Sequence, residues 1–156
     1  MDDQLPIKAN VTRRFGASPQ RVFDAWLDPK TAAQWLFARS TAQITCAEID
    51  PRVGGWFYIV ERRNGESFEH MGEYLEVVRP LCLVFILFAE KYSLEFERVT
   101  VVFHPQGSGC ELNLTHETKQ HLVGQIRRDW IQVLDGLAAV LDASSARSCA
   151  PSAAAR

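Results

Sequence analysis

The feature that most constrains the fold is an apolar stripe near the end of the chain, over residues 118–141. Its apolar residues recur every three or four positions, as in an amphipathic helix. The stripe consists of Val123, Ile126, Trp130, Val133, Leu134, Leu137 and Leu141. Asp129, Gln132 and Asp135 fall largely on the opposite side. Because so wide a stripe must be buried, and because residues 43–117 read mostly as strands, we expect one long helix packed across a large sheet.

Two glycines, Gly124 and Gly136, interrupt this helix, and each costs about 1 kcal/mol relative to alanine. A close approach of the helix to the sheet would explain why they are tolerated. The alternative is that they only weaken the helix.

Turn and capping signals divide the rest of the chain. Ser18-Pro19 is a helix start, with a serine N-cap and proline at the first helical position. Asn64-Gly65 predicts a tight hairpin turn. We expect a first strand at 7–15, short helices at 19–28 and 30–37, and six further strands at 43–49, 56–62, 68–78, 81–88, 93–104 and 110–117. Residues 7–142 form a single predicted domain, and 1–6 and the Ala/Ser-rich segment 143–156 are predicted to be flexible tails.

The order of these elements predicts an α+β fold: strand, two helices, six antiparallel strands and a long helix. A curved sheet cannot touch a straight helix everywhere, so the arrangement favours an internal cavity between them. The two short helices would close one end of that cavity.

Composition excludes several classes of function. The net charge is −2 and the basic pairs are isolated, so we expect no nucleic-acid partner. The longest apolar run, at 81–89, is far shorter than the roughly 20 residues that a membrane helix needs. The N-terminus lacks a signal-peptide pattern, and the four cysteines are scattered without a C-x-x-C, which favours a cytoplasmic protein with reduced thiols.

Five segments of the chain resemble one known family. They are residues 15–29 (FGASPQRVFDAWLDP), 49–55 (IDPRVGG), 72–78 (GEYLEVV), 112–117 (LNLTHE) and 130–137, with its Trp-x-x-Val-Leu-x-x-Leu pattern. In this order they are similar to the AHSA1-like proteins, homologues of the activator of Hsp90 ATPase within the START/Bet v 1-like (SRPBCC) superfamily. The resemblance implies the helix-grip (Bet v 1-like) fold. It leaves function open, because the superfamily includes lipid carriers, hormone receptors and cyclases.

The chain departs from the family pattern at a few positions. Cys110 stands where a threonine often follows the final hairpin glycine, and Asp129 replaces the glycine of a common Gly-Trp pair. Trp56 and Tyr58 stand where polar residues are frequent.

An excess of aromatic and aliphatic side chains on the inward-facing positions predicts an apolar ligand cavity. Ordinary core packing is the alternative, and we expect it to account for most of the aromatic residues. The candidate cavity residues are Trp35, Phe37, Phe57, Ile59, Met71, Leu75, Phe85, Leu87, Val99, Val101, Phe103, Leu114, His116, Ile126 and Trp130.

The polar candidates lie on the same predicted strands. His116 alternates with Leu112 and Leu114, so it is a candidate polar anchor or proton-transfer group; a histidine bonded to the backbone at the strand end is the alternative. Glu95 and Glu97 alternate with inward-facing residues, but a bend in the strand would place both in water. Glu61 and Glu73 are further carboxylates that could face either the cavity or water.

The sequence contains no motif typical of a metal site, a catalytic nucleophile or a dinucleotide site. The four histidines, His70, His104, His116 and His121, have no metal-ligand spacing, so we expect no metal. No nucleophile elbow or dinucleotide fingerprint occurs, so we name no catalytic residue and expect no cofactor.

These observations leave three readings of function. The first is a binding protein for a small hydrophobic or amphipathic molecule. The second is an interaction module that stimulates an Hsp90-type chaperone ATPase, and the third is a cyclase- or hydratase-like enzyme that uses His116. We also expect a homodimer, because Trp56, Tyr58, Val84 and Ile86 would form an apolar patch on the outer face of the sheet.

Overall fold

A computed structural model describes residues 7–39, 42–88 and 96–154. The elements in chain order are β1 (Ile7–Phe15), α1 (Pro19–Leu27), α2 (Pro29–Ala32), β2 (Gln43–Ile49), β3 (Trp56–Arg63), β4 (Glu66–Val78), β5 (Cys82–Phe88), β6 (Phe96–Gln106), β7 (Gly109–Thr118), the 3-10 turn η2 (Gln120–Leu122) and α3 (Val123–Ala154). This is the predicted order of one strand, two short helices, six strands and a long helix, and the predicted α+β helix-grip fold is confirmed.

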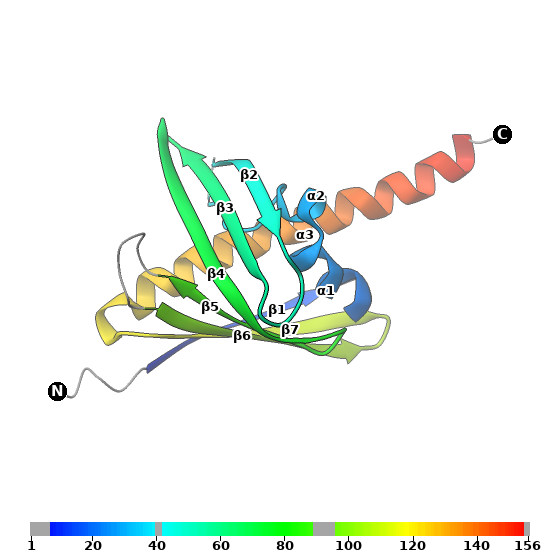
Figure 1. Ribbon diagram of the computed structural model, residues 1–156. Helices are drawn as coiled ribbons and strands as arrows, with labels where there is room; N and C mark the ends of the chain where they lie inside the picture. Colours follow the sequence, from blue (N-terminus) through cyan, green and yellow to red (C-terminus); the bar gives the residue numbers. More distant parts are fainter. Residues whose placement is uncertain (1–6, 40–41, 89–95, 155–156) are drawn as a thin grey trace.

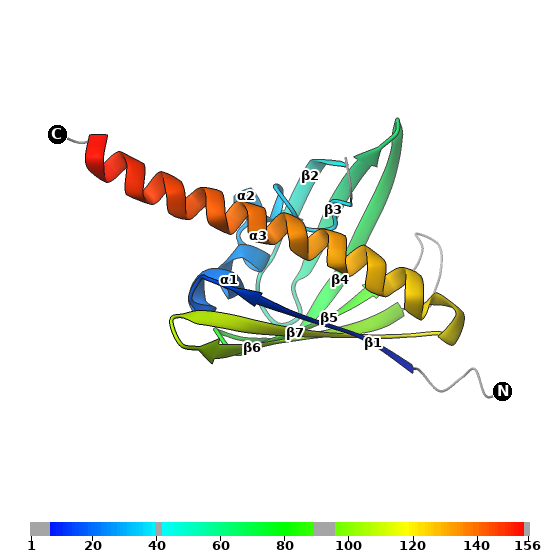
Figure 2. The same cartoon turned by 180° about the vertical axis from the view of Figure 1, so that it is seen from behind.

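The seven strands form one antiparallel sheet in the order β1-β7-β6-β5-β4-β3-β2. Figure 1 shows β2, β3 and β4 turned steeply upward from β6 and β7, so the sheet is strongly curved. Both views show α3 crossing the hollow side of the sheet, with α1 and α2 packed beside it at one end (Figures 1 and 2).

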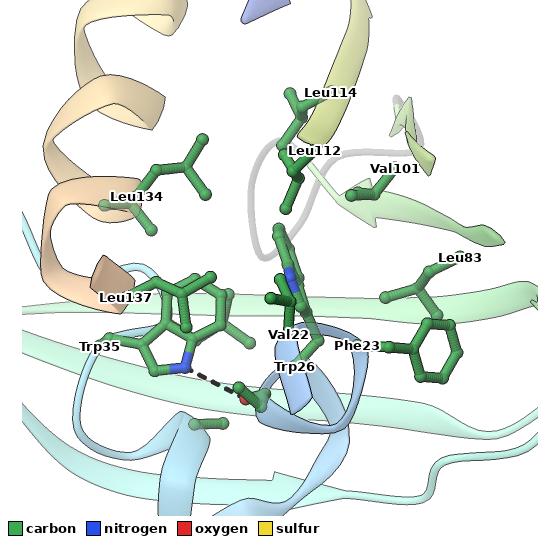
Figure 3. Packing of buried hydrophobic residues seen from close by; sticks show 14 of the residues in the cluster. Val22, Phe23, Trp26, Trp35, Leu83, Val101, Leu112, Leu114, Leu134 and Leu137 are labelled. Atoms are coloured by element: carbon green, nitrogen blue, oxygen red, sulfur yellow. Dashed lines mark hydrogen bonds between the residues drawn. The ribbon is translucent and has the colours of Figure 1, made fainter. Parts of the chain in front are cut away.

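The helical stripe is buried against this hollow side. Trp130, Val133, Leu134, Leu137 and Leu141 are all buried in the hydrophobic core. Figure 3 shows Leu134 and Leu137 of α3 facing a cluster from α1 and the sheet that includes Trp26, Leu112 and Leu114. The predicted packing of one long helix across the sheet is therefore confirmed.

The two helix glycines differ in their surroundings. A Cβ atom at Gly136 would lie 3.5 Å from the Cβ of Trp35, in ordinary contact, so the helix does pass close to its neighbour there. That neighbour is the segment after α2, not the sheet as we predicted. At Gly124 an added Cβ would meet only the side chain of Arg128, so close packing does not explain that glycine.

The predicted helix cap and the predicted hairpin turn are both present in the structure. The Ser18 side chain accepts a hydrogen bond from the backbone N–H of Arg21 and caps α1. Asn64 and Gly65 both have positive φ, of 55° and 80°, as a tight hairpin turn between β3 and β4 requires.

Some predicted boundaries were wrong. Residue 118 ends β7, and α3 begins only at Val123, after η2. The helix also continues past residue 141 to Ala154, because the segment that follows is rich in alanine, the best helix former. That residues 143–156 are flexible stays a prediction. The second short helix ends at Ala32, not at residue 37. The predicted N-terminal tail at 1–6 and the start of the strand at 93 lie outside the described residues.

The outer face is less apolar than we expected. Trp56 is half exposed, but Val84 is only 6% exposed and therefore adds nothing to a surface patch. Tyr58 donates a hydrogen bond to Glu69 on the same face, over 2.9 Å. The homodimer stays a prediction.

Candidate functional site

A pocket of about 600 Å³ opens between the first half of α3 and one end of the sheet. Its walls come from β4, β5, β6 and β7 and from the segment that follows α2. The apolar lining residues are Phe37, Phe68, Leu87, Phe88, Leu122, Ile126, Trp130 and Val133. The polar ones are Arg39, Ser67, Glu69, His70, Glu97, His116 and Asp129. Volume and lining are in the range of small-molecule sites, which combine apolar walls with a few polar groups.

The predicted cavity residues separate into three groups. Five of the fifteen line the pocket: Phe37, Leu87, His116, Ile126 and Trp130. Eight lie in the packed core, which was the alternative for them: Trp35, Phe57, Ile59, Phe85, Val99, Val101, Phe103 and Leu114. Figure 3 shows Trp35, Val101 and Leu114 as members of this buried cluster. That any of the fifteen binds a ligand stays a prediction.

The remaining two, Met71 and Leu75, belong neither to the pocket lining nor to the core cluster. Met71 pairs with Tyr58, whose neighbours Phe57 and Ile59 point into the core, so Met71 points outward. Leu75 lies at a β-bulge between Tyr74 and Glu76 and is left out of the pairing. The inward residues of β4 at these positions are Gly72 and Tyr74, both of which are buried.

One wall of the pocket is held in an uncommon backbone conformation. Phe37 has a φ of 66°, which is rare for a bulky residue. Its ring stacks on His70 with centroids 4.5 Å apart and planes only 7° apart, and it also packs 5.8 Å from Phe57 and 5.8 Å from Trp130. These contacts offset the backbone strain and fix the aromatic wall.

A hydrogen-bonded chain of side chains runs from α3 to the sheet at the pocket. The indole Nε1–H of Trp130 donates to Nδ1 of His116 over 2.9 Å. His116 Nε2 lies 2.6 Å from Oε1 of Glu97, and the hydroxyl of Thr118 donates to Oε2 of Glu97 over 2.8 Å. Because indole is only a donor, Nδ1 of His116 must be unprotonated. Nε2 must therefore carry the hydrogen and donate the hydrogen bond to Glu97.

The position of Glu97 corrects one sequence-based preference. The bend that would have placed this glutamate in water is absent from β6, and its side chain lies beside the pocket, 20% exposed. Burial opposes ionisation of Glu97, but the hydrogen bonds from His116 and Thr118 outweigh it and lower its pKa. Glu97 is therefore a carboxylate at neutral pH. Glu95 lies outside the described residues.

His116 likewise points to the pocket and not to a backbone partner, so the strand-end alternative is wrong. We expect long-range proton–nitrogen NMR spectra at about pH 7 to show its Nδ1 as an unprotonated, pyridine-like nitrogen. In Trp130→Phe, which removes the indole donor, the Glu97 carboxylate should still hold the proton on Nε2, so Nδ1 should stay unprotonated but lose the shift caused by its hydrogen bond. A wild-type ring protonated on Nδ1 would contradict the hydrogen-bond assignment.

A second polar cluster surrounds Glu61 on β3. Its carboxylate is fully buried and accepts hydrogen bonds from Arg39 through Nη2 (2.9 Å), Nε (3.2 Å) and the backbone N–H (3.3 Å). Nε2 of His70 lies 3.0 Å from Oε1, and Nε of Arg63 lies 3.2 Å from Oε2. Arg39 also reaches Asp129 on α3 over 3.4 Å, so this cluster joins the sheet to the helix.

Sequence reasoning missed most of this second cluster. Arg39 lies in an irregular segment without a period, and Asp129 was assigned to the solvent face of the helix. His70 was considered only as a metal ligand. Glu61 carried a usable signal, because it alternates with the inward residues Phe57 and Ile59. Glu73, which raised the same question, pairs with half-exposed Trp56 and faces outward.

Two structural absences hold for the described part of the chain. No group of three or more His, Cys, Asp or Glu side chains is arranged to hold a metal ion. No helix within it combines the length and apolar character that crossing a membrane requires.

Comparison with known proteins identifies relatives of the whole domain. The model of the family described as "Activator of Hsp90 ATPase homolog 1-like protein" matches residues 16–142. Protein CV1439 from Chromobacterium violaceum is 25% identical with a TM-score of 0.77, over 90% of this chain and 97% of that one. An AHSA1-like protein from Aeromonas hydrophila is 23% identical with a TM-score of 0.79, over 89% and 94%. CalU16 from Micromonospora echinospora is 20% identical with a TM-score of 0.66, over 91% and 80%, which shows a shared fold. A search among curated proteins finds no significant match.

Proposed function

We propose that the chain, which belongs to the activator of Hsp90 ATPase homolog 1-like family, binds a small amphipathic molecule in the pocket between α3 and the sheet. The observation that carries the proposal is the composition of the lining. Aromatic and aliphatic walls surround a short row of polar groups that are held in fixed orientations by one another. Such a site buries an apolar body and orients one polar group.

The geometry favours binding over proton transfer by His116. Both ring nitrogens of His116 are already engaged, one by Trp130 and one by Glu97. A general base must reach the proton that it removes, directly or through one water. His116 therefore acts by orienting the Glu97 carboxylate, which is the group that meets the ligand.

Native mass spectrometry of freshly purified protein, followed by organic extraction, tests the proposal directly. We expect a co-purifying small molecule, or uptake of an added uncharged fluorescent probe such as N-phenyl-1-naphthylamine. Stimulation of the ATP turnover of an Hsp90-type chaperone, without any bound small molecule, would favour the interaction module instead. Turnover of the bound molecule that is lost in His116→Ala would favour the enzyme.

Filling the pocket should abolish binding without unfolding the protein. In Ile126→Trp the indole replaces a side chain that lines the pocket and is only partly buried, so it has room to occupy the pocket space. We expect at least a tenfold weaker affinity for the extracted molecule or the probe, measured by titration calorimetry or fluorescence.

The matched control is Ile131→Trp, on the exposed side of the same helix, where Ile131 is 40% exposed. It adds the same side chain and should leave affinity unchanged. Equal affinity of both variants for the bound molecule would place the binding site elsewhere.

A further inference from the structure

The strong hydrogen-bond donors that line the pocket are already used by the protein. Trp130 donates to His116, His116 donates to Glu97, and Arg39 donates to Glu61 and Asp129. The guanidinium of Arg39 is paired with two carboxylates. A ligand that accepts from Trp130 or His116 would have to displace one of these internal bonds. Its binding would leave a buried carboxylate or imidazole without a partner, which is costly.

The carboxylate of Glu97, in contrast, can still accept hydrogen bonds from a ligand. A carboxylate has two oxygens with about four acceptor positions, and His116 and Thr118 occupy one position on each oxygen. The side chain is 20% exposed and belongs to the pocket lining. The two internal bonds fix its orientation, so the carboxylate is preorganised to accept further hydrogen bonds from a ligand.

The charge of the lining points in the same direction. Two carboxylates, on Glu97 and Asp129, line the pocket together with one guanidinium, that of Arg39. Glu69 also borders the pocket, but its carboxylate accepts from Tyr58 on the outer face of the sheet. Arg39 is already paired with the buried Glu61 as well as with Asp129. Lys119 acts on Glu97 from the chain segment after β7 and is not part of the lining. An anionic ligand therefore meets an excess of like charge.

The surroundings of Glu97 also suit the apolar part of a cation. Leu87 pairs with Glu97 across β5 and β6, and Trp130 lies one hydrogen-bonded residue away through His116. Phe37 and Trp130, whose ring centroids lie 5.8 Å apart, also line this pocket. Aromatic faces attract cations, and a carboxylate next to them completes an ammonium site.

We propose that the molecule bound in this pocket is an amphipathic amine, whose protonated nitrogen donates to Glu97 while its apolar body lies between α3 and the sheet. This inference rests on the proposed function, because it names the class of ligand for the same pocket.

Three probes with the same ten-carbon chain test it: decylamine, decanol and decanoate, each used below the concentration at which it forms micelles. Titration calorimetry with the full chain at about pH 7 should give the tightest binding for decylamine, about tenfold tighter than decanol, and the weakest for decanoate. A charge-assisted hydrogen bond is stronger than a neutral one by about this factor. Decanol binding as tightly as decylamine, or decanoate binding most tightly, would overturn the inference.

Glu97→Gln locates the effect. It should remove the advantage of decylamine over decanol. Glu76→Gln, which removes the same charge from an exposed position on β4, should keep the advantage. If both variants keep it, the ammonium does not bind at Glu97 and the inference fails.

The proposed function and the inference fail in different ways. Failure of all three probes to bind the wild-type chain would count against the apolar pocket itself. Equal binding of all three would leave the pocket standing and overturn only its preference for amines. Because the wild-type comparison decides between these outcomes, the test does not depend on the folding of either variant.

Discussion

Replacing Glu61 with glutamine is expected to lower the free energy of unfolding by about 3–5 kcal/mol at neutral pH, as breaking a buried ion pair does. Glu61 is fully buried and is hydrogen-bonded to Arg39, Arg63 and His70. Glutamine keeps the volume but removes the negative charge that these groups share. Its amide nitrogen would also face donors. Chemical denaturation at about pH 7 measures the loss.

The same carboxylate should make the stability of the protein depend on pH. Burial of Glu61 opposes its ionisation, but hydrogen bonds from His70 and Arg39 and the charge of Arg39 lower its pKa from 4.5 to about 2. Since the pKa is lower in the folded state, the contribution is fully present above the unfolded-state value and is lost as pH falls toward 2. The shift corresponds to about 3 kcal/mol. The difference in stability between wild type and Glu61→Gln should therefore shrink as the pH is lowered from about 6 to about 3.

The control for both measurements is Glu76→Gln, an exposed carboxylate on β4. We expect it to change the free energy of unfolding by less than about 0.5 kcal/mol, as surface substitutions usually do. If Glu61→Gln were no less stable than this control, the buried cluster that joins β3 to α3 would not contribute to folding.

The fold was predictable because it is encoded by local periodicity. Burial of one side of a helix and one face of a strand repeats every three to four or every two residues, so the α3 stripe and the inward residues of β6 and β7 appear directly in the sequence. Capping and turn chemistry added the boundaries at Ser18 and at Asn64-Gly65, where one residue type satisfies a backbone requirement.

β4 shows where periodicity fails. Its outward face carries Met71, a bulge takes Leu75 out of the pairing, and its inward face carries His70 and Gly72, so apolar character does not mark the inward side. Gly72 is required because a Cβ atom there would lie 2.7 Å from the ring of Phe57 and 1.9 Å from the carbonyl oxygen of Ile86. The ring of Phe57 on β3 fills the space beside Gly72, and the sequence of β4 alone does not reveal this.

The pocket depends on contacts between distant parts of the chain. Arg39 and Glu61 are 22 positions apart, and Glu97 and His116 are 19 apart on neighbouring strands. Each residue type was visible in the sequence, but the partner of each was set by the register of the sheet and the path of the segment after α2. His116 was found because strand alternation placed it inward. The same alternation applies to Glu97, but we preferred a bend that would place it in water, and Arg39 was missed because it has no such pattern.

Replacing Trp130 with alanine should lower the free energy of unfolding by about 3–5 kcal/mol, the usual range for a buried aromatic side chain. Trp130 is 4% exposed, packs 5.9 Å from Trp26 and 5.8 Å from Phe37, and also donates its indole N–H to His116. The exposed Trp56, which is 50% exposed, provides the control. Trp56→Ala removes the same side chain from the outer face and should cost less than about 1 kcal/mol.

Trp130→Phe separates packing from hydrogen bonding at this position. Phenylalanine retains most of the ring contacts but leaves Nδ1 of His116 without its donor, so we expect a loss of about 1–3 kcal/mol, below that of the alanine variant. Because His116 then loses one of the two hydrogen bonds that hold its ring, it orients the Glu97 carboxylate less firmly, and decylamine affinity should fall with stability. A Trp130→Ala protein with the wild-type melting temperature would show that the stripe of α3 is not buried against the sheet. A Trp130→Phe protein with unchanged stability and unchanged ligand affinity would show that the hydrogen bond to His116 does not orient the site.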